Sequence, residues 1–187
     1  MRRAEQTNGH REGDVLKGLA AGLIGGLVAS WVMEEFQAGW TKMSETPSES
    51  REKDSSGHGG GQDDATQQQP ATVKAAEAIS EGVFGHELTQ SEKEIFGPAV
   101  HYLLGASVGG LYGAATELTP EVGAGVGLPF GSVFWLVVDE AAVPLLGLSK
   151  GPTEYPLSTH VYALASHLVY GLTTEVVRRV LRRTILS

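Results

Sequence analysis

Three glycine repeats constrain what this chain can fold into. In each repeat the glycines stand four residues apart, so on an α-helix they fall on one face. The repeats are Gly18, Gly22 and Gly26; Gly105, Gly109 and Gly113; and Gly123, Gly127 and Gly131. An interior glycine costs a helix in water about 0.5–1 kcal/mol relative to alanine, whereas lipid enforces the helix because backbone groups find no other partners there. Small residues let helix backbones approach closely, so the repeats predict the packing faces of a membrane bundle.

The mean hydropathy of the 187-residue chain is -0.07, and this average hides two unlike parts. Residues 41–75 are almost entirely polar, whereas four segments are mostly apolar: 15–33, 99–116, 122–148 and 157–177. The net charge is -8 and the basic residues cluster at the two ends, which disfavours nucleic acid as a partner. The chain has no cysteine, which excludes disulfides, thiol catalysis and cysteine-ligated metal.

The apolar segments predict an all-α integral membrane protein with four transmembrane helices, at 15–36, 98–118, 122–146 and 157–178. A helix of the first span's length is about 33 Å long, enough to cross a hydrocarbon core of about 30 Å. A cleaved signal peptide is the alternative for the first segment. Acidic residues before it and the absence of an Ala-x-Ala site after it disfavour that alternative.

The polar segments between and around these spans complete the organisation. We expect polar, basic tails at 1–14 and 179–187, an extracytoplasmic loop at 37–97 that is disordered over 41–70, and an outer loop at 147–156. Within the first loop, the alanine-rich stretch 71–84 predicts an amphipathic helix that lies on the membrane or on the bundle. Thr89 and Glu92 have the spacing of a capping box and predict the start of the next helix.

The placement of lysine and arginine predicts the orientation. Arg2, Arg3, Arg11 and Lys17 flank the first span, and four arginines follow the last one. By the positive-inside rule both termini stay in the cytoplasm, which an even number of spans satisfies.

Short motifs near the end of the chain resemble a known family. The run Ser166-His-Leu-Val-Tyr-Gly171, followed by Glu175-Val-Val-Arg-Arg179, is similar to the C-terminal signature of the YagU-like family of bacterial inner-membrane proteins. Pro144-Leu-Leu-Gly-Leu148 and the run His101–Glu117 with its Leu111-Tyr112-Gly113 resemble that family too. The resemblance covers 15–36 and 99–183, and it implies an inner-membrane location and a fold rather than an activity. The polar insertion at 41–75 departs from the family's shape.

Helix rise predicts where the ionisable residues of the spans lie. An outer cluster is expected at the ends of the spans, with one histidine about 10 Å deeper. Its members are Glu35, His101, Asp139, Glu140 and His160, and the deeper histidine is His167. At the inner end, Glu175 precedes Arg178 and Arg179 by three and four residues, which predicts an intrahelical ion pair.

Three interpretations of the outer cluster are compatible with the sequence. The side chains could hydrogen-bond across helices for structural reasons alone. They could handle protons and respond to external acid, because histidine titrates near neutral pH. They could also bind a metal or haem through His101 with His160 or His167 and a carboxylate.

The chain has no nucleophile elbow, P-loop or dinucleotide fingerprint, so we do not expect an enzyme, a cofactor or an assigned metal site. We expect an integral membrane protein whose partner is the lipid bilayer and which responds to envelope stress or pH. The alternatives are a subunit of a small homo-oligomeric transporter or channel, and a metal- or haem-binding bundle.

Overall fold

The computed structural model describes residues 2–44 and 69–185, with the side chains of the first helix described from residue 13 onward. These residues form helices and turns without a β-strand, as the all-α prediction requires. Most of the predicted disordered segment 41–70 lies outside the described residues. In chain order the elements are α1 Arg2–Ser44, α2 Ala71–Ile79, η1 Ser80–Phe84, α3 Gln90–Leu118, η2 Pro120–Gly127, α4 Leu128–Val137, η3 Val138–Ala142, α5 Val143–Leu145, η4 Pro152–Glu154 and α6 Leu157–Thr184.

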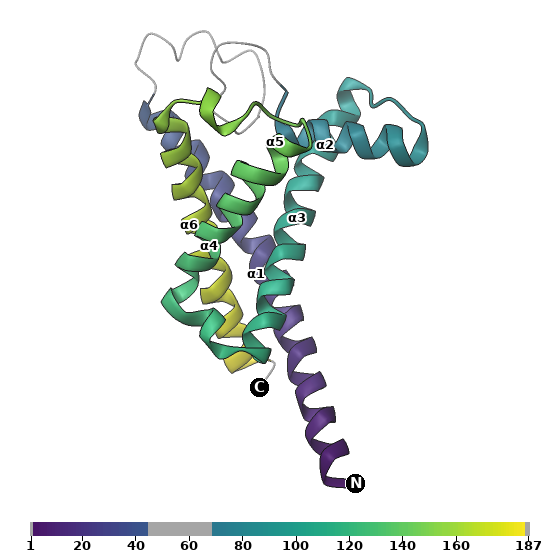
Figure 1. Ribbon diagram of the computed structural model, residues 1–187, viewed down its shortest axis with the longest axis vertical. Helices are drawn as coiled ribbons and strands as arrows, with labels where there is room; N and C mark the ends of the chain where they lie inside the picture. Colours follow the sequence, from purple (N-terminus) through teal and green to yellow (C-terminus); the bar gives the residue numbers. More distant parts are fainter. Residues whose placement is uncertain (1, 45–68, 186–187) are drawn as a thin grey trace.

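The long helices run alternately up and down the bundle (Figure 1). α1 and α4 run in one direction, and α3 and α6 run in the other, so the two ends of the chain lie at the same end of the bundle. At the opposite end α2 and η1 project sideways from the start of α3. We call the end with the chain termini the terminal end, and the other end the arm end.

α1 and α3 meet backbone to backbone through two of the glycine repeats. A Cβ atom added at Gly22 would overlap the carbonyl oxygen of Gly109, and one added at Gly26 would overlap that of Gly105. Gly18 meets Gly113 in the same way. Because α1 and α3 run in opposite directions, moving four residues forward along α1 corresponds to moving four residues backward along α3. At these glycines no added side chain fits between the two helices, which fixes their spacing and their register.

A second close crossing joins α4 to α6. A Cβ atom at Gly131 would overlap the carbonyl oxygen of His167, and one at Gly127 would overlap that of Gly171. Gly171 in turn faces the Gly127 carbonyl. α6 also contacts α1, where Gly25 lies against the backbone of Thr174. α6 is thus the helix that joins the α1–α3 pair to α4.

The predicted span 122–146 is not one regular α-helix. Its first part, η2, is a 3₁₀ segment, and its last three residues have left-handed backbone angles at Gly125, Val126 and Gly127. α4 begins at Leu128 with Pro129 in its first turn, where proline's missing N–H needs no partner. The wider π-helical turn η3 then interrupts the helix before α5. Closely spaced glycines lower the cost of left-handed backbone, and this unwinds the start of the segment.

The boundaries of two other predicted segments also differ. α1 continues from Arg2 to Ser44, so residues 2–14 of the predicted tail and residues 37–44 of the predicted loop are helical. α3 starts at Gln90, where the predicted capping box is confirmed: Thr89 Oγ1 accepts from the Glu92 N–H, and the Glu92 carboxylate accepts from the Thr89 N–H at 2.8 Å. α3 runs on through Pro98.

The core is small and aromatic. Tyr112 stacks on Phe130 with ring centroids 4.0 Å apart, and Phe134 and Tyr170 complete the cluster. The Tyr170 hydroxyl donates a 2.6 Å hydrogen bond to the Gly105 carbonyl oxygen, so it is satisfied although it is buried. This core lies where α1, α3, α4 and α6 approach one another.

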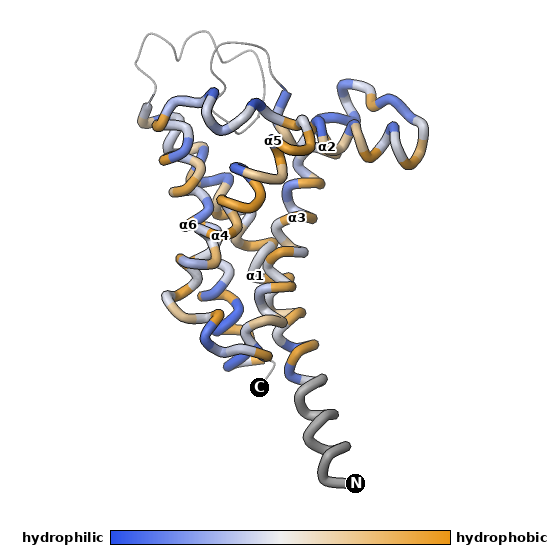
Figure 2. The backbone as a smooth tube through the Cα atoms, in the orientation of Figure 1, coloured by the Kyte–Doolittle hydropathy of each residue, from blue (hydrophilic) through white to orange (hydrophobic). Residues whose placement is uncertain are grey.

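Many large apolar side chains are exposed on the bundle, and Figure 2 shows hydrophobic residues along each of its long helices. Along α3 the side chains of Leu103, Leu111 and Leu118 are each about two-thirds exposed. Two described segments, Gly13–Ser44 and Pro120–Leu145, are long and apolar enough to cross a membrane. Exposed leucines in such numbers indicate an exterior suited to lipid or to another apolar surface.

The close contact between Gly22 and the Gly109 backbone can be tested by mutation. In Gly22→Ala the added methyl group overlaps the Gly109 backbone, which cannot rotate away as a side chain can. We expect a loss of about 1–3 kcal/mol of stability, seen as a lower midpoint of thermal unfolding in detergent. Gly39→Ala in the same helix is the control, because its methyl group meets nothing within 4 Å. Equal midpoints for the two variants would contradict the close crossing.

The capping box predicts a pH effect outside the apolar region. Hydrogen bonds from the Thr89 backbone and hydroxyl, with His86 nearby, lower the pKa of Glu92 from 4.5 to about 2. A lowered pKa means that the carboxylate stabilises the fold above pH 4.5, and that this contribution is lost as the pH falls through about 2. The difference in unfolding midpoint between the wild type and Glu92→Gln should therefore be constant near neutral pH and vanish in strong acid. A difference that persists unchanged into strong acid would refute this role.

Candidate functional site

Polar side chains gather at the arm end of the bundle, where the end of α1, the start of α3, η3 and the start of α6 meet. We call this group the arm-end cluster. Its members are Glu34, His101, Tyr102, Asp139, Glu140, His160 and His167.

His160 is held by two acceptors. Its Nδ1 lies 2.6 Å from Oε1 of Glu140, and its Nε2 lies 2.9 Å from the carbonyl oxygen of Pro152. A carbonyl oxygen only accepts, so Nε2 carries a hydrogen. The carboxylate is satisfied when Nδ1 carries one as well. The geometry is therefore the one that a protonated imidazolium satisfies, and it ties α6 to η3 and to the loop before α6.

His167 lies about two turns after His160 on α6 and is buried. Its Nδ1 is 2.9 Å from the carbonyl oxygen of Ala163 one turn earlier, and 3.6 Å from Oδ2 of Asp139. The first distance is a hydrogen bond and the second is a charge contact only. The ring also meets Phe134 edge-on, with centroids 5.1 Å apart. His167 is thus a core residue that faces a carboxylate.

His101 and Tyr102 bring α3 into the cluster. The Tyr102 hydroxyl donates a 2.5 Å hydrogen bond to Oε2 of Glu34. The Nε2 atom of His101 is buried and has no hydrogen-bond partner among the described residues, while Glu34, Asp139 and His167 are the charged or titratable groups around it. His101 is therefore the least satisfied member of the cluster.

The structure places Glu34, not Glu35, in the cluster. Glu35 is exposed, whereas Glu34 is partly buried against Tyr102. Adjacent residues on a helix differ by about 100° in direction, so only one of the two can face α3. The predicted residues do not form one connected group either. His160 pairs with Glu140, and His167 faces Asp139, as two separate contacts.

The described residues offer no group of three or more His, Cys, Asp or Glu side chains that could hold a metal ion. Ligation of a metal ion by His101 with His160 or His167 and a carboxylate is therefore not supported by their positions. The paired contacts instead suit the making and breaking of single hydrogen bonds by protonation.

A second polar group, which we call the terminal-end network, centres on Glu175. This glutamate is completely buried. It accepts hydrogen bonds from Arg178 at 2.7 and 2.9 Å and from Arg179 at 2.6 Å, which is the intrahelical pair that the spacing predicted. Arg179 also donates to the Gly123 carbonyl oxygen at 2.8 Å. Glu175 therefore anchors η2 as well as its own helix.

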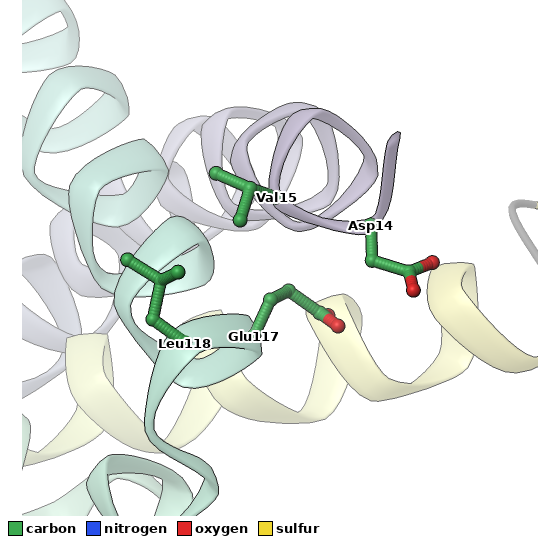
Figure 3. Close-up of a pocket in the computed structure, with 4 residues that line it drawn as sticks. All are labelled: Asp14, Val15, Glu117 and Leu118. Atoms are coloured by element: carbon green, nitrogen blue, oxygen red, sulfur yellow. The ribbon is translucent and has the colours of Figure 1, made fainter. Parts of the chain in front are cut away.

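Arg182 extends this network to α3 and α1. It donates to Glu117 at 2.7 and 3.0 Å, and it lies 3.4 Å from Asp14. Asp14 and Glu117, with Val15 and Leu118, line a small pocket of about 110 Å³ (Figure 3). Both carboxylates of this pocket are engaged by Arg182, so we regard it as a gap beside a structural ion pair.

Comparison with known proteins shows which family these features belong to. Residues 81–176 match the model of a family described as "Protein of unknown function (DUF1440)". The chain belongs to the DUF1440 family. No curated protein and no solved structure matches it.

The DUF1440 region contains most of the arm-end cluster, including its four predicted histidine and carboxylate partners from η3 and α6. It also contains Glu117 and Glu175 of the terminal-end network. α1 lies outside the matched region, although it supplies Glu34, Asp14 and one side of the glycine crossing.

Sequence reasoning missed the interhelical part of the terminal-end network. The sequence does contain a signal for this network. Arg178, Arg179 and Arg182 follow Glu175 at helical spacing, and Asp14 and Glu117 flank other apolar segments. Charge spacing on one helix does not tell which neighbouring helix a charge will reach.

Removing the buried anion tests this network. In Glu175→Ala the side chains of Arg178 and Arg179 lose their central partner, and breaking such a buried pair costs about 3–5 kcal/mol. We expect a large fall in the unfolding midpoint in detergent. Glu121→Ala, an exposed acidic residue at the same end, is the control and should leave the midpoint nearly unchanged. Similar midpoints for both variants would show that Glu175 is not an anchor.

Proposed function

We propose that this chain is a four-span integral protein of the bacterial inner membrane, of the YagU-like type, with both termini in the cytoplasm. The two apolar segments long enough to cross a membrane support this proposal. So do the alternating directions of α1, α3, α4 and α6 and the exposed leucines along α3. The terminal end carries the arginines of α6, which favours the cytoplasmic side for that end. The partner that we propose is therefore the lipid bilayer.

We further propose that its role is not enzymatic but a response to pH at the outer face. The observation that carries this proposal is the contact of His160 with Glu140 on one side and with Pro152 on the other. Loss of one imidazole proton leaves a lone pair facing either the carboxylate or the carbonyl oxygen. The contact is therefore strong when His160 is protonated and weak when it is not.

The elements joined by this contact explain how protonation would change the bundle. Glu140 lies in η3, whose wider turn departs from regular α-helix, and Pro152 lies in the loop that precedes α6. The groups that face His160 from these elements are the Glu140 carboxylate and the backbone carbonyls of Pro152 and Tyr155. The three elements are held together while His160 is protonated, and the contact loosens when rising pH removes that proton.

A double-mutant cycle of His160→Gln and Glu140→Gln tests the proposal. We expect the coupling energy, measured from unfolding midpoints in detergent, to be larger at about pH 5 than at about pH 8, because it depends on the imidazolium, whose population falls as the pH rises. Replacement of His101, His160 and His167 together by alanine should flatten the pH profile of stability. His86→Ala, on the exposed arm, is the control and should leave the cycle unchanged. A coupling energy that does not vary with pH would reject the proposed response.

A further inference from the structure

The arm formed by α2, η1 and the first turns of α3 carries an apolar surface that no described part of the chain covers. We call this the arm surface. Its large side chains are between 45% and 76% exposed. They are Ile79, Val83, Phe84, Ile95 and Phe96. Exposed apolar side chains gathered in one small element indicate a partner.

The other side of the arm is already occupied by the bundle. Ala76 of α2 is buried, Val73 packs against Gly97 of α3, and Lys93 forms a 2.5 Å ion pair with Glu77. α2 is therefore docked on α3, which is one of the two placements left open by its amphipathic pattern. The arm surface is what remains free after this docking.

The position of the arm along the length of the bundle indicates which partner covers the arm surface. The exposed apolar side chains of α3 begin at Ile95 and Phe96 and continue through Leu111 to Leu118. From Phe96 to Leu118 the helix rises about 33 Å, close to the thickness of a hydrocarbon core of about 30 Å. α2 contacts α3 at Gly97, so the arm stands at one edge of this apolar band.

The direction in which the arm projects and the charge that it carries both agree with a position at the edge of the apolar band. The arm projects sideways from α3 (Figure 1), and in Figure 2 its lower edge, toward the body of the bundle, is mainly hydrophobic while its upper edge is hydrophilic. Its charged residues are mostly acidic, with Glu77, Glu81, Glu92 and Glu94 against Lys74 and Lys93. Attraction to anionic headgroups is therefore weak, and apolar burial must hold the arm in place.

We propose that the arm lies in the outer membrane–water interface, with the arm surface inserted among the upper parts of the lipid acyl chains. The arm then acts as an interfacial anchor at the arm end of the bundle. This inference rests on the proposed membrane location. It adds a named lipid-binding surface that does not follow from the spans alone.

The absence of cysteine allows a clean test by single labelling. The full-length protein is reconstituted in vesicles of zwitterionic lipid, with an environment-sensitive fluorophore on Phe84→Cys. Nitroxide quenchers are placed on the lipid acyl chains, either close to the headgroup or near the chain end. We expect a blue-shifted emission, strong quenching by the shallow nitroxide and weaker quenching by the deep one.

Two labelled variants serve as controls. Glu81→Cys lies two residues from Val83, on the other side of the turn, and should be quenched by neither lipid nitroxide. Leu111→Cys, in the middle of the apolar band, should be quenched more by the deep nitroxide. Quenching at Leu111 without quenching at Phe84 would overturn the arm proposal and leave the membrane location standing. No quenching at Leu111 would overturn the membrane location itself.

A second variant shows whether the apolar side chains hold the arm. In Val83→Ser/Phe84→Ser, a label on Ile79→Cys, which lies on α2 and outside the apolar band of α3, should lose its shallow quenching. The unfolding midpoint should stay close to that of the wild type, because Val83 and Phe84 do not belong to the core. If the label on Ile79 remains quenched, Val83 and Phe84 do not hold the arm in the interface, and the proposed anchor is refuted. If the label on Phe84 is blue-shifted but no lipid nitroxide quenches it, the arm surface is covered by protein, which would also refute a lipid partner.

Discussion

The backbone contact between α1 and α3 is the constraint on which the rest of the structure depends. Because Gly22 and Gly109 bring main chain against main chain, neither helix can slide or rotate without a steric clash. The register set there places Glu34 beside Tyr102 at one end of the bundle. It also brings Asp14 and Glu117 to the same arginine at the other end. Two polar groups far apart in space are thus aligned by a contact between glycine backbones.

The two ends of the bundle use different chemistry. At the terminal end the cations are arginines, which stay charged at every physiological pH, so the contacts of Glu175 are permanent. At the arm end the partners of Glu140 and Asp139 are histidines, a residue type that gains and loses its proton far more readily than arginine does. In the proposed function the terminal end is therefore the anchor and the arm end is the part that responds to pH. The irregular turn η3 lies at the arm end, where regular helix packing is interrupted.

Several elements could be predicted because they depend on local spacing. The capping box at Thr89 and Glu92 needs only three residues between its partners, and it is present. The all-helical character follows from long apolar stretches in which a helix is the way to pair every backbone group. By contrast, the unwound segment η2 lies within an apolar stretch, and hydropathy does not distinguish helix from turn when both are apolar. The glycines at 125 and 127 allow the turn, but they are equally compatible with a packing face.

The chemistry of the cluster was predicted only in part, for a geometric reason. Spacing along a helix sets the height of a residue in the bundle, and it correctly predicted that His160 and Glu140 lie at the same level. It does not set the rotation of one helix against another, so the selection of Glu34 over Glu35 had to come from packing.

The sequence alone therefore determined the secondary structure class, the apolar segments and the faces on which glycines let helices approach. Tertiary structure alone decided which carboxylate meets a cation on another helix, as in the hydrogen bond from Arg182 to Glu117. The physical reason is that periodicity along the chain is a property of one helix, whereas a contact between side chains depends on the relative rotation and height of two.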